Sequence, residues 1–153
     1  MKQRKIIVNK FGGGILKKDL IPFIEKRIKQ QISDGYSPVI VVSALPGVTD
    51  GLLRKAKGKS TQEKDKIVSM GERKSAQILA KHLCDLGIQA EVVEAEEMIV
   101  TDDNFGNANI IYKLSAKNVR EKLRSLEKIP VIPGFIGKTK KGATTTLGRG
   151  GTD

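Results

Sequence analysis

The last ten residues of the chain combine side chains and backbone that suit the binding of a small anion. Residues 144–153 hold threonines, glycines, Arg149 and Asp153, and Leu147 is the only apolar side chain among them. Glycines let the backbone approach a ligand closely, and an arginine grips a carboxylate through two parallel hydrogen bonds, which a lysine cannot do. The segment therefore predicts an anion-binding loop, although Arg149 taken alone also fits a surface arginine in a flexible tail.

Lys10 and the glycines that follow Phe11 form a second candidate site. They come directly after an apolar run, and a glycine loop at the carboxyl end of a strand presents backbone N–H groups to an anion. The spacing is neither that of a Walker A loop nor the Gly-x-Gly-x-x-Gly dinucleotide fingerprint. We expect Lys10, Gly12 and Gly13 to contact phosphate, although glycines also serve tight turns that need a positive φ.

Small polar residues follow the second apolar run as well. Ser43 and Thr49 lie in the segment 43–50, directly after residues 38–42. Parallel sheets bind their ligands at the carboxyl ends of the strands. Ser43 and Thr49 are therefore candidate ligand contacts, and Thr49 or Asp50 would also serve as a helix cap.

Glu72 is the most specific single candidate for a ligand-binding residue. It shares one face of a predicted helix with the apolar residues four, seven and eleven positions later, and a buried carboxylate needs a cationic partner or a ligand. Gly71 precedes it, and a glycine inside a helix costs roughly 1 kcal/mol relative to alanine, which a close approach to the backbone would explain. The alternative is a carboxylate at the rim of this face, paired with Arg73 or Lys74 or simply solvated.

Alternating strands and helices must position these candidates, and the sequence predicts an α/β fold with a mainly parallel sheet flanked by helices. Runs of β-branched residues predict the strands, and a 3.6-residue apolar period with a capping box at Ser60 and Glu63 predicts the helices. The predicted strands cover residues 5–8, 38–42, 89–93 and 130–132, and the first is expected to be buried. The predicted helices cover residues 20–32, 60–86 and 118–126, and a β-hairpin near the C-terminus covers residues 135–146.

Composition narrows the class of protein. The 153 residues suffice for one domain with a core, and they contain neither a bilayer-spanning apolar run nor a signal peptide. Cys84 is the only cysteine, which rules out an internal disulfide and fits the cytoplasm, and a single His and a single Cys argue against a protein-held metal. A net charge of +11 fits phosphorylated ligands, nucleic acid or a lysine-rich surface. Aromatic residues make up only 4% of the chain, so few side chains are available to stack on nucleic-acid bases, and we expect no nucleic-acid partner.

Six stretches of the chain together resemble the aspartate kinases, within the amino acid kinase family. They occur in the family's order, and the last is the most specific. They are Lys10-Phe11-Gly12-Gly13, VVSALPGVTD, SMGERKSA, VTDDNFGNA, PVIPGFIG and TTTLGRGGTD.

The resemblance implies transfer of the γ-phosphate of ATP to the side-chain carboxylate of L-aspartate, at the entry to lysine, threonine and methionine synthesis. It implies that Lys10 contacts the ATP phosphates beside Gly12 and Gly13, that Mg²⁺ is carried by the nucleotide, and that Asp153 orients Lys10. The residues that would surround L-aspartate are Ser43, Thr49, Glu72, Phe135, Arg149 and Thr152. Arg149 suits the α-carboxylate and Glu72 the ammonium group, and a nucleophile whose pKa is about 4 needs no general base.

Departures from the family pattern leave other functions open. Gly14 and Ile15 stand where the family usually has Thr and Ser, and the segment between Thr49 and Gly71 is shorter than in the family. By resemblance, residues 1–153 are the aspartate-binding N-terminal lobe, without the nucleotide-binding half and the ACT domains. We therefore expect little or no ATP turnover unless a homo-oligomer or a complementary nucleotide-binding chain completes the site. The alternatives are a non-catalytic module that binds aspartate or phosphate, and another amino acid kinase.

Overall fold

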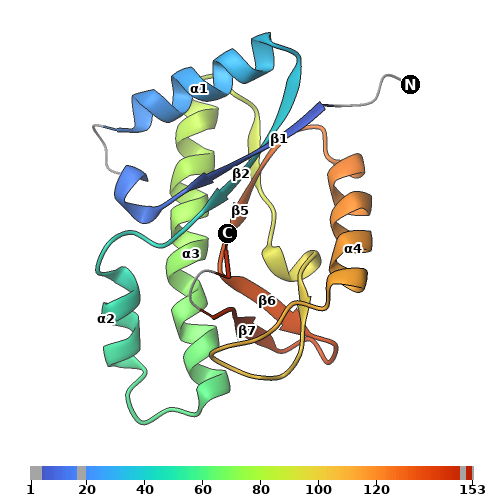
Figure 1. The fold of residues 1–153 in the computed structure, drawn as a ribbon. Helices are drawn as coiled ribbons and strands as arrows, with labels where there is room; N and C mark the ends of the chain where they lie inside the picture. Colours follow the sequence, from blue (N-terminus) through green and yellow to red (C-terminus); the bar gives the residue numbers. More distant parts are fainter. Residues whose placement is uncertain (1–4, 17–19, 149–150, 153) are drawn as a thin grey trace.

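A four-stranded parallel sheet forms the centre of the molecule (Figure 1). The computed structural model describes residues 5–16, 20–148 and 151–152 of the chain. The strands are β1 (Lys5–Phe11), β2 (Tyr36–Val42), β3 (Ala90–Val92) and β5 (Ile129–Pro133), in the order β1-β2-β5-β3. All three strand pairs are parallel, as the sequence predicts. Their carboxyl ends therefore meet at one edge, where the candidate residues are expected.

Helices cover both faces of this sheet (Figure 1). The first face is covered by α1 (Ile21–Ser33) and the long α3 (Thr61–Asp85), and the second by α4 (Tyr112–Ser125). A short helix, α2 (Val48–Lys55), packs against α3, and η1 (Gly13–Leu16) and η2 (Ala95–Glu97) are single 3₁₀ turns. Ser60 caps α3 through the predicted capping box, because its hydroxyl accepts from Glu63 N–H while the Glu63 carboxylate accepts from Ser60 N–H.

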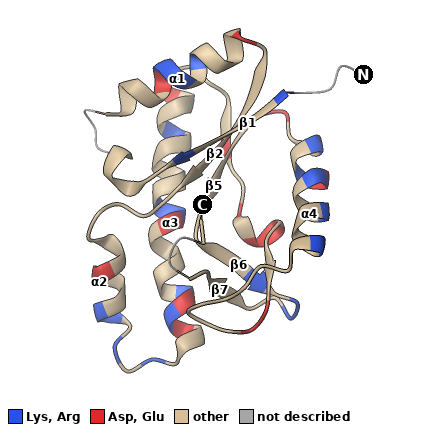
Figure 2. Cartoon of the chain, in the orientation of Figure 1, with Lys and Arg blue, Asp and Glu red and all other residues tan. Residues whose placement is uncertain are grey.

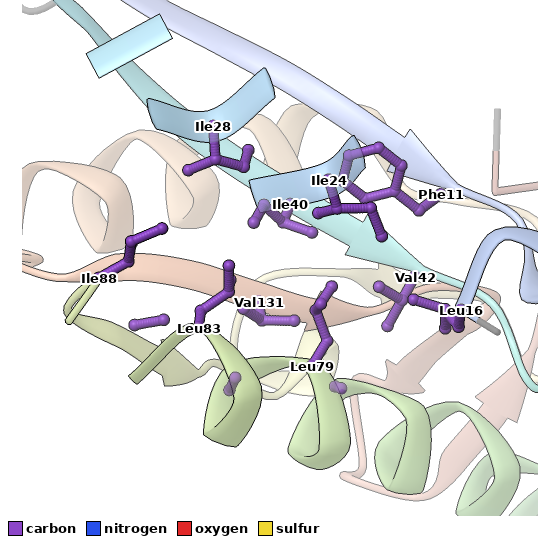
Figure 3. Close-up of a cluster of buried hydrophobic side chains, with 13 residues drawn as sticks. Phe11, Leu16, Ile24, Ile28, Ile40, Val42, Leu79, Leu83, Ile88 and Val131 are labelled. Carbon is purple, nitrogen blue, oxygen red and sulfur yellow. The ribbon is translucent and has the colours of Figure 1, made fainter. Parts of the chain in front are cut away.

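The main core lies between the first face of the sheet and the helices α1 and α3 (Figure 3). Ile24 and Ile28 reach down from α1, and Leu83 rises from α3, toward Ile40 and Val131 in the two central strands. None of these five side chains is more than 1% exposed. Burying each contributes roughly 1.5–3 kcal/mol, so the sheet and α3 form a firm support for whatever lies at the carboxyl edge.

A second, smaller sheet holds the predicted hairpin. The strands β6 (Ile136–Thr139) and β7 (Thr144–Thr146) are antiparallel, and β4 (Val100–Thr101) adds to β6 in parallel. The hydroxyl groups of Thr101 and Thr145 are 2.8 Å apart and form a buried hydrogen bond between β4 and β7. The hairpin prediction is confirmed, but the sequence did not predict β4, because two residues are too few to show a period.

The first strand differs from its prediction in burial and in length. Ile6 is 49% and Val8 62% exposed, because β1 is at the edge of the sheet and the second cluster of buried side chains covers β2 and β5 instead. The strand also continues to Phe11, so Lys10 lies within β1 and the glycines follow it. The expectation of a buried strand at residues 5–8 was therefore wrong.

The sequence missed one helix and the start of another, and neither helix has a capping side chain at its N-terminus. The helix α4 begins at Tyr112, six residues before the predicted start, and Ile111 precedes it without a side-chain cap. The helix α2 was not predicted, and its N-cap is Gly47 with φ of 77°. Thr49 and Asp50 lie inside its first turn, so neither caps a helix.

A buried pair of amide side chains joins β1 to α1, and no sequence pattern predicted this pair. Asn9 Nδ2 donates to Gln31 Oε1 at 2.9 Å, and Gln31 Nε2 donates back to Asn9 Oδ1 at 2.8 Å. Arg27 Nε donates to the same Asn9 oxygen at 2.9 Å. This network fixes the edge strand that carries Lys10 against its supporting helix.

We expect Gln31→Leu to lower the free energy of unfolding by about 2 kcal/mol, because it leaves the buried Asn9 Nδ2 group without its acceptor. Adding Asn9→Leu to that variant is expected to recover part of the loss. Urea unfolding of the single and double variants measures both effects. Gln30→Leu is the matched control, since Gln30 is exposed on the same helix; an equal loss in the control would refute the role of the pair.

Charged residues are spread over the molecule rather than gathered on one element. Lys and Arg lie on all four α-helices and on the connection between α2 and α3 (Figure 2). None of the helices in the described part of the chain has both the length and the apolar character needed to cross a bilayer.

Candidate functional site

The loops that follow β1, β2 and β5 lie side by side and hold most of the described candidates. Ser43 N–H donates to the Phe11 carbonyl at 3.1 Å, and Gly134 N–H donates to the Val42 carbonyl at 2.8 Å. These bonds continue the sheet past its strand ends and set the three loops in register. Lys10, one residue before the end of β1, is exposed beside Val41 in the neighbouring strand.

Gly13 is the point where the first two loops touch. A Cβ atom at Gly13 would lie 1.8 Å from the carbonyl oxygen of Ala44. At Gly12 and Gly14 a Cβ would have nothing within 4 Å, and none of the three glycines has a positive φ. The alternative of a turn that needs positive φ is therefore wrong. Gly13 is required by the close approach of the two loops, whereas Gly12 leaves its backbone open to a ligand.

We expect Gly13→Ala to lower the free energy of unfolding by about 1–3 kcal/mol, because the clash is with backbone and must shift a loop. Gly14→Ala is the matched control and is expected to leave stability unchanged or slightly raised, since the methyl group enters open space. Thermal unfolding of the two variants compares them directly. If Gly14→Ala proved the more damaging change, the close approach of the two loops would be refuted.

Glu72 is buried, as its helical spacing predicts, with 4% of its surface exposed. Ala44 N–H donates to its carboxylate, and Oε2 has no hydrogen-bond partner. Burial raises the pKa of Glu72 to about 7, against the opposing effect of the Ala44 hydrogen bond. Among the described residues no cation pairs with it. A buried carboxylate with one satisfied oxygen is an acceptor held ready for a donor from outside the fold.

The alternative position for Glu72, at the rim of its helix face, is wrong. Arg73 instead donates to Glu94 Oε2 at 2.7 Å and to Glu96 Oε1 at 2.6 Å, across to η2. The alternative pairing of Glu72 with Arg73 therefore does not occur, because the next residue of a helix points about 100° away.

Gly71 is explained by the approach of α2 and the loop before it. A Cβ atom at Gly71 would lie 3.1 Å from Val48 Cγ1, 3.2 Å from Leu52 Cδ1 and 3.2 Å from Ala44 Cβ. The predicted close approach to the backbone is confirmed, and protein side chains make it. Glycine at this position lets the loop after β2 press on α3, and so brings Ala44 N–H to Glu72.

Phe135 and Thr152 meet at the third loop. Phe135 has φ of 64°, an uncommon conformation for a bulky residue and one that is often found at binding sites. A Cβ atom at Gly134 would lie 2.5 Å from Thr152 Cγ2, so Thr152 packs directly onto this loop. Both residues line an apolar cavity of about 230 Å³ between the sheet and α4.

The structure thus brings Gly12, Gly13, Ser43, Phe135 and Thr152 to the same edge, with Lys10 beside them and Glu72 beneath. Thr49 lies further along, in the first turn of α2. Arg149 and Asp153 are outside the described residues, so their roles stay predictions. In the described ranges no three His, Cys, Asp or Glu side chains are placed to hold a metal ion.

Sequence reasoning missed Asp65, which joins α3 to β7 and to the loop at residue 106. Asp65 is 2% exposed and accepts from Gly106 N–H at 2.9 Å, Thr146 N–H at 2.9 Å and the Thr146 hydroxyl at 2.7 Å. It stands two helical turns before Glu72 on the same face, so its burial was predictable from the same period. Its partners in the loop at residue 106 and in β7 were not.

Comparisons with known proteins agree with this architecture. Residues 5–153 match the model of the amino acid kinase family. Aspartokinase 1 of Bacillus subtilis is 38% identical over 160 residues, which cover 97% of this chain and 39% of that protein. The aspartokinase of Helicobacter pylori strain 26695 is 38% identical over 154 residues, covering 97% and 38%. The chain therefore spans about two fifths of the length of the curated relatives that it matches.

Solved structures share the fold. Aspartokinase III of E. coli, in complex with aspartate and ADP, superposes with a TM-score of 0.82 at 24% identity, over 97% of this chain and 44% of that one. The same enzyme in complex with lysine and aspartate gives a TM-score of 0.80.

Proposed function

Because the chain belongs to the amino acid kinase family, we propose that its 153 residues are the aspartate-binding lobe of an aspartate kinase. The observation that carries the proposal is Glu72, a buried carboxylate with one unpaired oxygen at the carboxyl edge of the sheet. Its charge and depth suit an ammonium group, and the relatives that match over the whole lobe are named aspartokinases.

In the proposed complex the two charged ends of L-aspartate are held by different elements. Glu72 accepts from the ammonium group, and Arg149 grips the α-carboxylate through two hydrogen bonds. Ser43, Thr49 and Thr152 supply hydroxyl groups around the ligand. Phe135 closes the apolar side of the site, and its strained backbone keeps the ring in place.

The proposed reaction forms a bond between a side-chain oxygen of L-aspartate and the γ-phosphorus of ATP, and breaks the bond from that phosphorus to the bridging oxygen of ADP. The attacking carboxylate is already ionised at neutral pH, so no protein base is needed. Lys10, oriented by Asp153, and the backbone at Gly12 and Gly13 neutralise and align the phosphates. Mg²⁺ would be carried by the nucleotide and would supply further positive charge to its phosphates.

The nucleotide needs more contacts than these. The curated relatives are more than twice as long as the matched region, and we propose that residues outside these 153 bind the adenosine. They would lie in the same polypeptide, in a second copy or in a complementary chain. The proposed place of action is the cytoplasm, where ATP and the amino acid precursors are found.

One observation favours a second function, a non-catalytic module that binds aspartate. Ile15, where the family usually has a hydroxyl residue, packs against the main core and presents no donor to a phosphate. Gly14 beside it has no side chain at all. Such a module would keep Glu72 and Arg149 while losing part of the phosphate loop.

Calorimetric titration with L-aspartate and, separately, with Mg-ATP tests these proposals, with Arg149→Ala as the comparison. L-aspartate binding that disappears in the variant supports the aspartate lobe, and turnover of Mg-ATP would separate a kinase from a binding module. If the wild-type chain binds ATP but not L-aspartate, the proposed function is overturned.

A further inference from the structure

Two buried side-chain atoms in the described part of the chain have no hydrogen-bond partner, and both are on α3. One is Glu72 Oε2, and the other is the hydroxyl oxygen of Ser75. Ser75 is 2% exposed, so water does not satisfy its hydroxyl at the surface. An unpaired buried hydroxyl is destabilising, so a serine at this position is unfavourable unless its hydroxyl has a function.

Two other serines on helices show one way in which Ser75 would be satisfied if it had only a structural role. The hydroxyl of Ser69 donates to the Lys66 carbonyl at 2.8 Å, and that of Ser125 donates to the Lys122 carbonyl at 2.8 Å. This bond to the carbonyl three residues back is the ordinary way to satisfy a hydroxyl inside a helix. Ser75 does not make it, so its hydroxyl is turned elsewhere.

Helix geometry brings Ser75 to Glu72. The two residues are three positions apart, and Gly71 is four positions before Ser75, so all three share one side of α3. Side chains on a helix lean toward its N-terminus, which sets the Ser75 hydroxyl over the turn that contains Gly71 and Glu72. That turn abuts Ala44. The unpaired hydroxyl and the unpaired carboxylate oxygen therefore both lie under the loop that follows β2.

We propose that Ser75 is a second binding residue for the ammonium group that Glu72 receives, a refinement that rests on the proposed function. An ammonium group carries three N–H donors, and Glu72 Oε2 and Ser75 Oγ are two acceptors without donors. The loop that follows β2 separates these two atoms from solvent, and Ala44 in this loop, which bonds to Glu72, is itself partly exposed. A ligand that shifts this loop reaches both atoms from the carboxyl edge of the sheet.

The test compares Ser75→Ala with Ser69→Ala, a serine on the same helix whose hydroxyl is already paired. Binding of L-aspartate and L-glutamate is measured by calorimetry against succinate and glutarate, which lack only the ammonium group. Ser75→Ala is expected to weaken the binding of the amino acid about tenfold or more, as for a hydrogen bond to a charged group, and to leave binding of the matching diacid unchanged. Ser69→Ala is expected to leave the affinities for both unchanged.

The melting temperature without ligand gives a second readout. If Ser75 had a structural role, Ser75→Ala would lower this temperature. Ser75→Ala is expected to melt at the same temperature as the wild type or higher, because it removes an unpaired hydroxyl, whereas Ser69→Ala is expected to melt lower. Equal weakening of amino acid and diacid by Ser75→Ala would overturn the proposal. If L-glutamate binds and L-aspartate does not, the proposed function fails. The comparison of L-glutamate with glutarate in wild type and Ser75→Ala then still tests the Ser75 proposal. If neither amino acid binds, both proposals are overturned.

Discussion

Glu72→Gln is expected to weaken L-aspartate binding strongly and, at pH 8, to raise the free energy of unfolding of the ligand-free chain. Glutamine keeps the shape of the side chain, and its carbonyl oxygen still accepts from Ala44 N–H. It removes the charge that the ammonium group requires, and losing one partner of a buried charge pair typically costs 2–5 kcal/mol. The affinity measured by calorimetry should therefore fall by at least about thirtyfold.

The gain in stability follows from the raised pKa of Glu72. Burial raises this pKa to about 7, so between about pH 4.5 and 7 the folded chain holds a proton that the unfolded chain has lost. The Glu72 contribution to the free energy of unfolding therefore falls as pH rises through this window, by about 3 kcal/mol at most. Above pH 7 the charged carboxylate remains buried without a cation, and glutamine avoids that penalty.

Urea unfolding at pH 5, 6, 7 and 8 measures this contribution as the difference between the wild type and Glu72→Gln. The difference should widen with pH up to about 7 and then level off. Glu121→Gln is the control, because Glu121 is exposed on α4 with its nearest cation 3.9 Å away, and its difference from the wild type should be small at every pH. Parallel curves for wild type and Glu72→Gln would contradict the raised pKa.

The same titration predicts how binding depends on pH. A protonated Glu72 must lose its proton before it accepts from an ammonium group, so L-aspartate affinity should decline as pH falls below about 7. Succinate, which lacks the ammonium group, should not show that decline with the same midpoint.

Features set by one element and its neighbours in sequence were predictable. The β-branched runs identified the four strands of the main sheet, and the capping box at Ser60 identified the start of α3. The helical period placed Glu72 on a buried face, where a carboxylate needs a cationic partner or a ligand. These inferences needed only the spacing of residues along one element.

Features set by contacts between distant segments were not predictable. The exposure of Ile6 and Val8 depends on β1 having a neighbour on one side only. Gly12 and Gly13 look alike in the sequence, and only the approach of Ala44 separates a glycine needed for packing from one whose backbone is open. Ser75 resembled any helical serine until its hydroxyl was found without a partner.

Asp65→Ala is expected to be strongly destabilising, lowering the free energy of unfolding by about 3–5 kcal/mol, because each buried donor left unpaired costs about 1–3 kcal/mol. The substitution leaves three donors without an acceptor, namely Gly106 N–H, Thr146 N–H and the Thr146 hydroxyl. Two of these lie in β7, so the variant also frees the strand from α3. Asp65→Asn should cost less, because its carbonyl oxygen can still accept from both N–H groups.

Asp85→Ala is the matched control for Asp65→Ala in urea unfolding, because Asp85 is exposed on the same helix and pairs with Lys81 at its surface. It is expected to change stability by less than about 1 kcal/mol. A similar loss in both variants would show that the hydrogen bonds of Asp65 do not hold the hairpin. Thr146 stands three residues before Arg149, so a strand released from α3 also loses its hold on the predicted carboxylate-binding loop. Asp65→Asn should then weaken L-aspartate binding more than its modest loss of stability accounts for, whereas Asp85→Ala should leave binding unchanged.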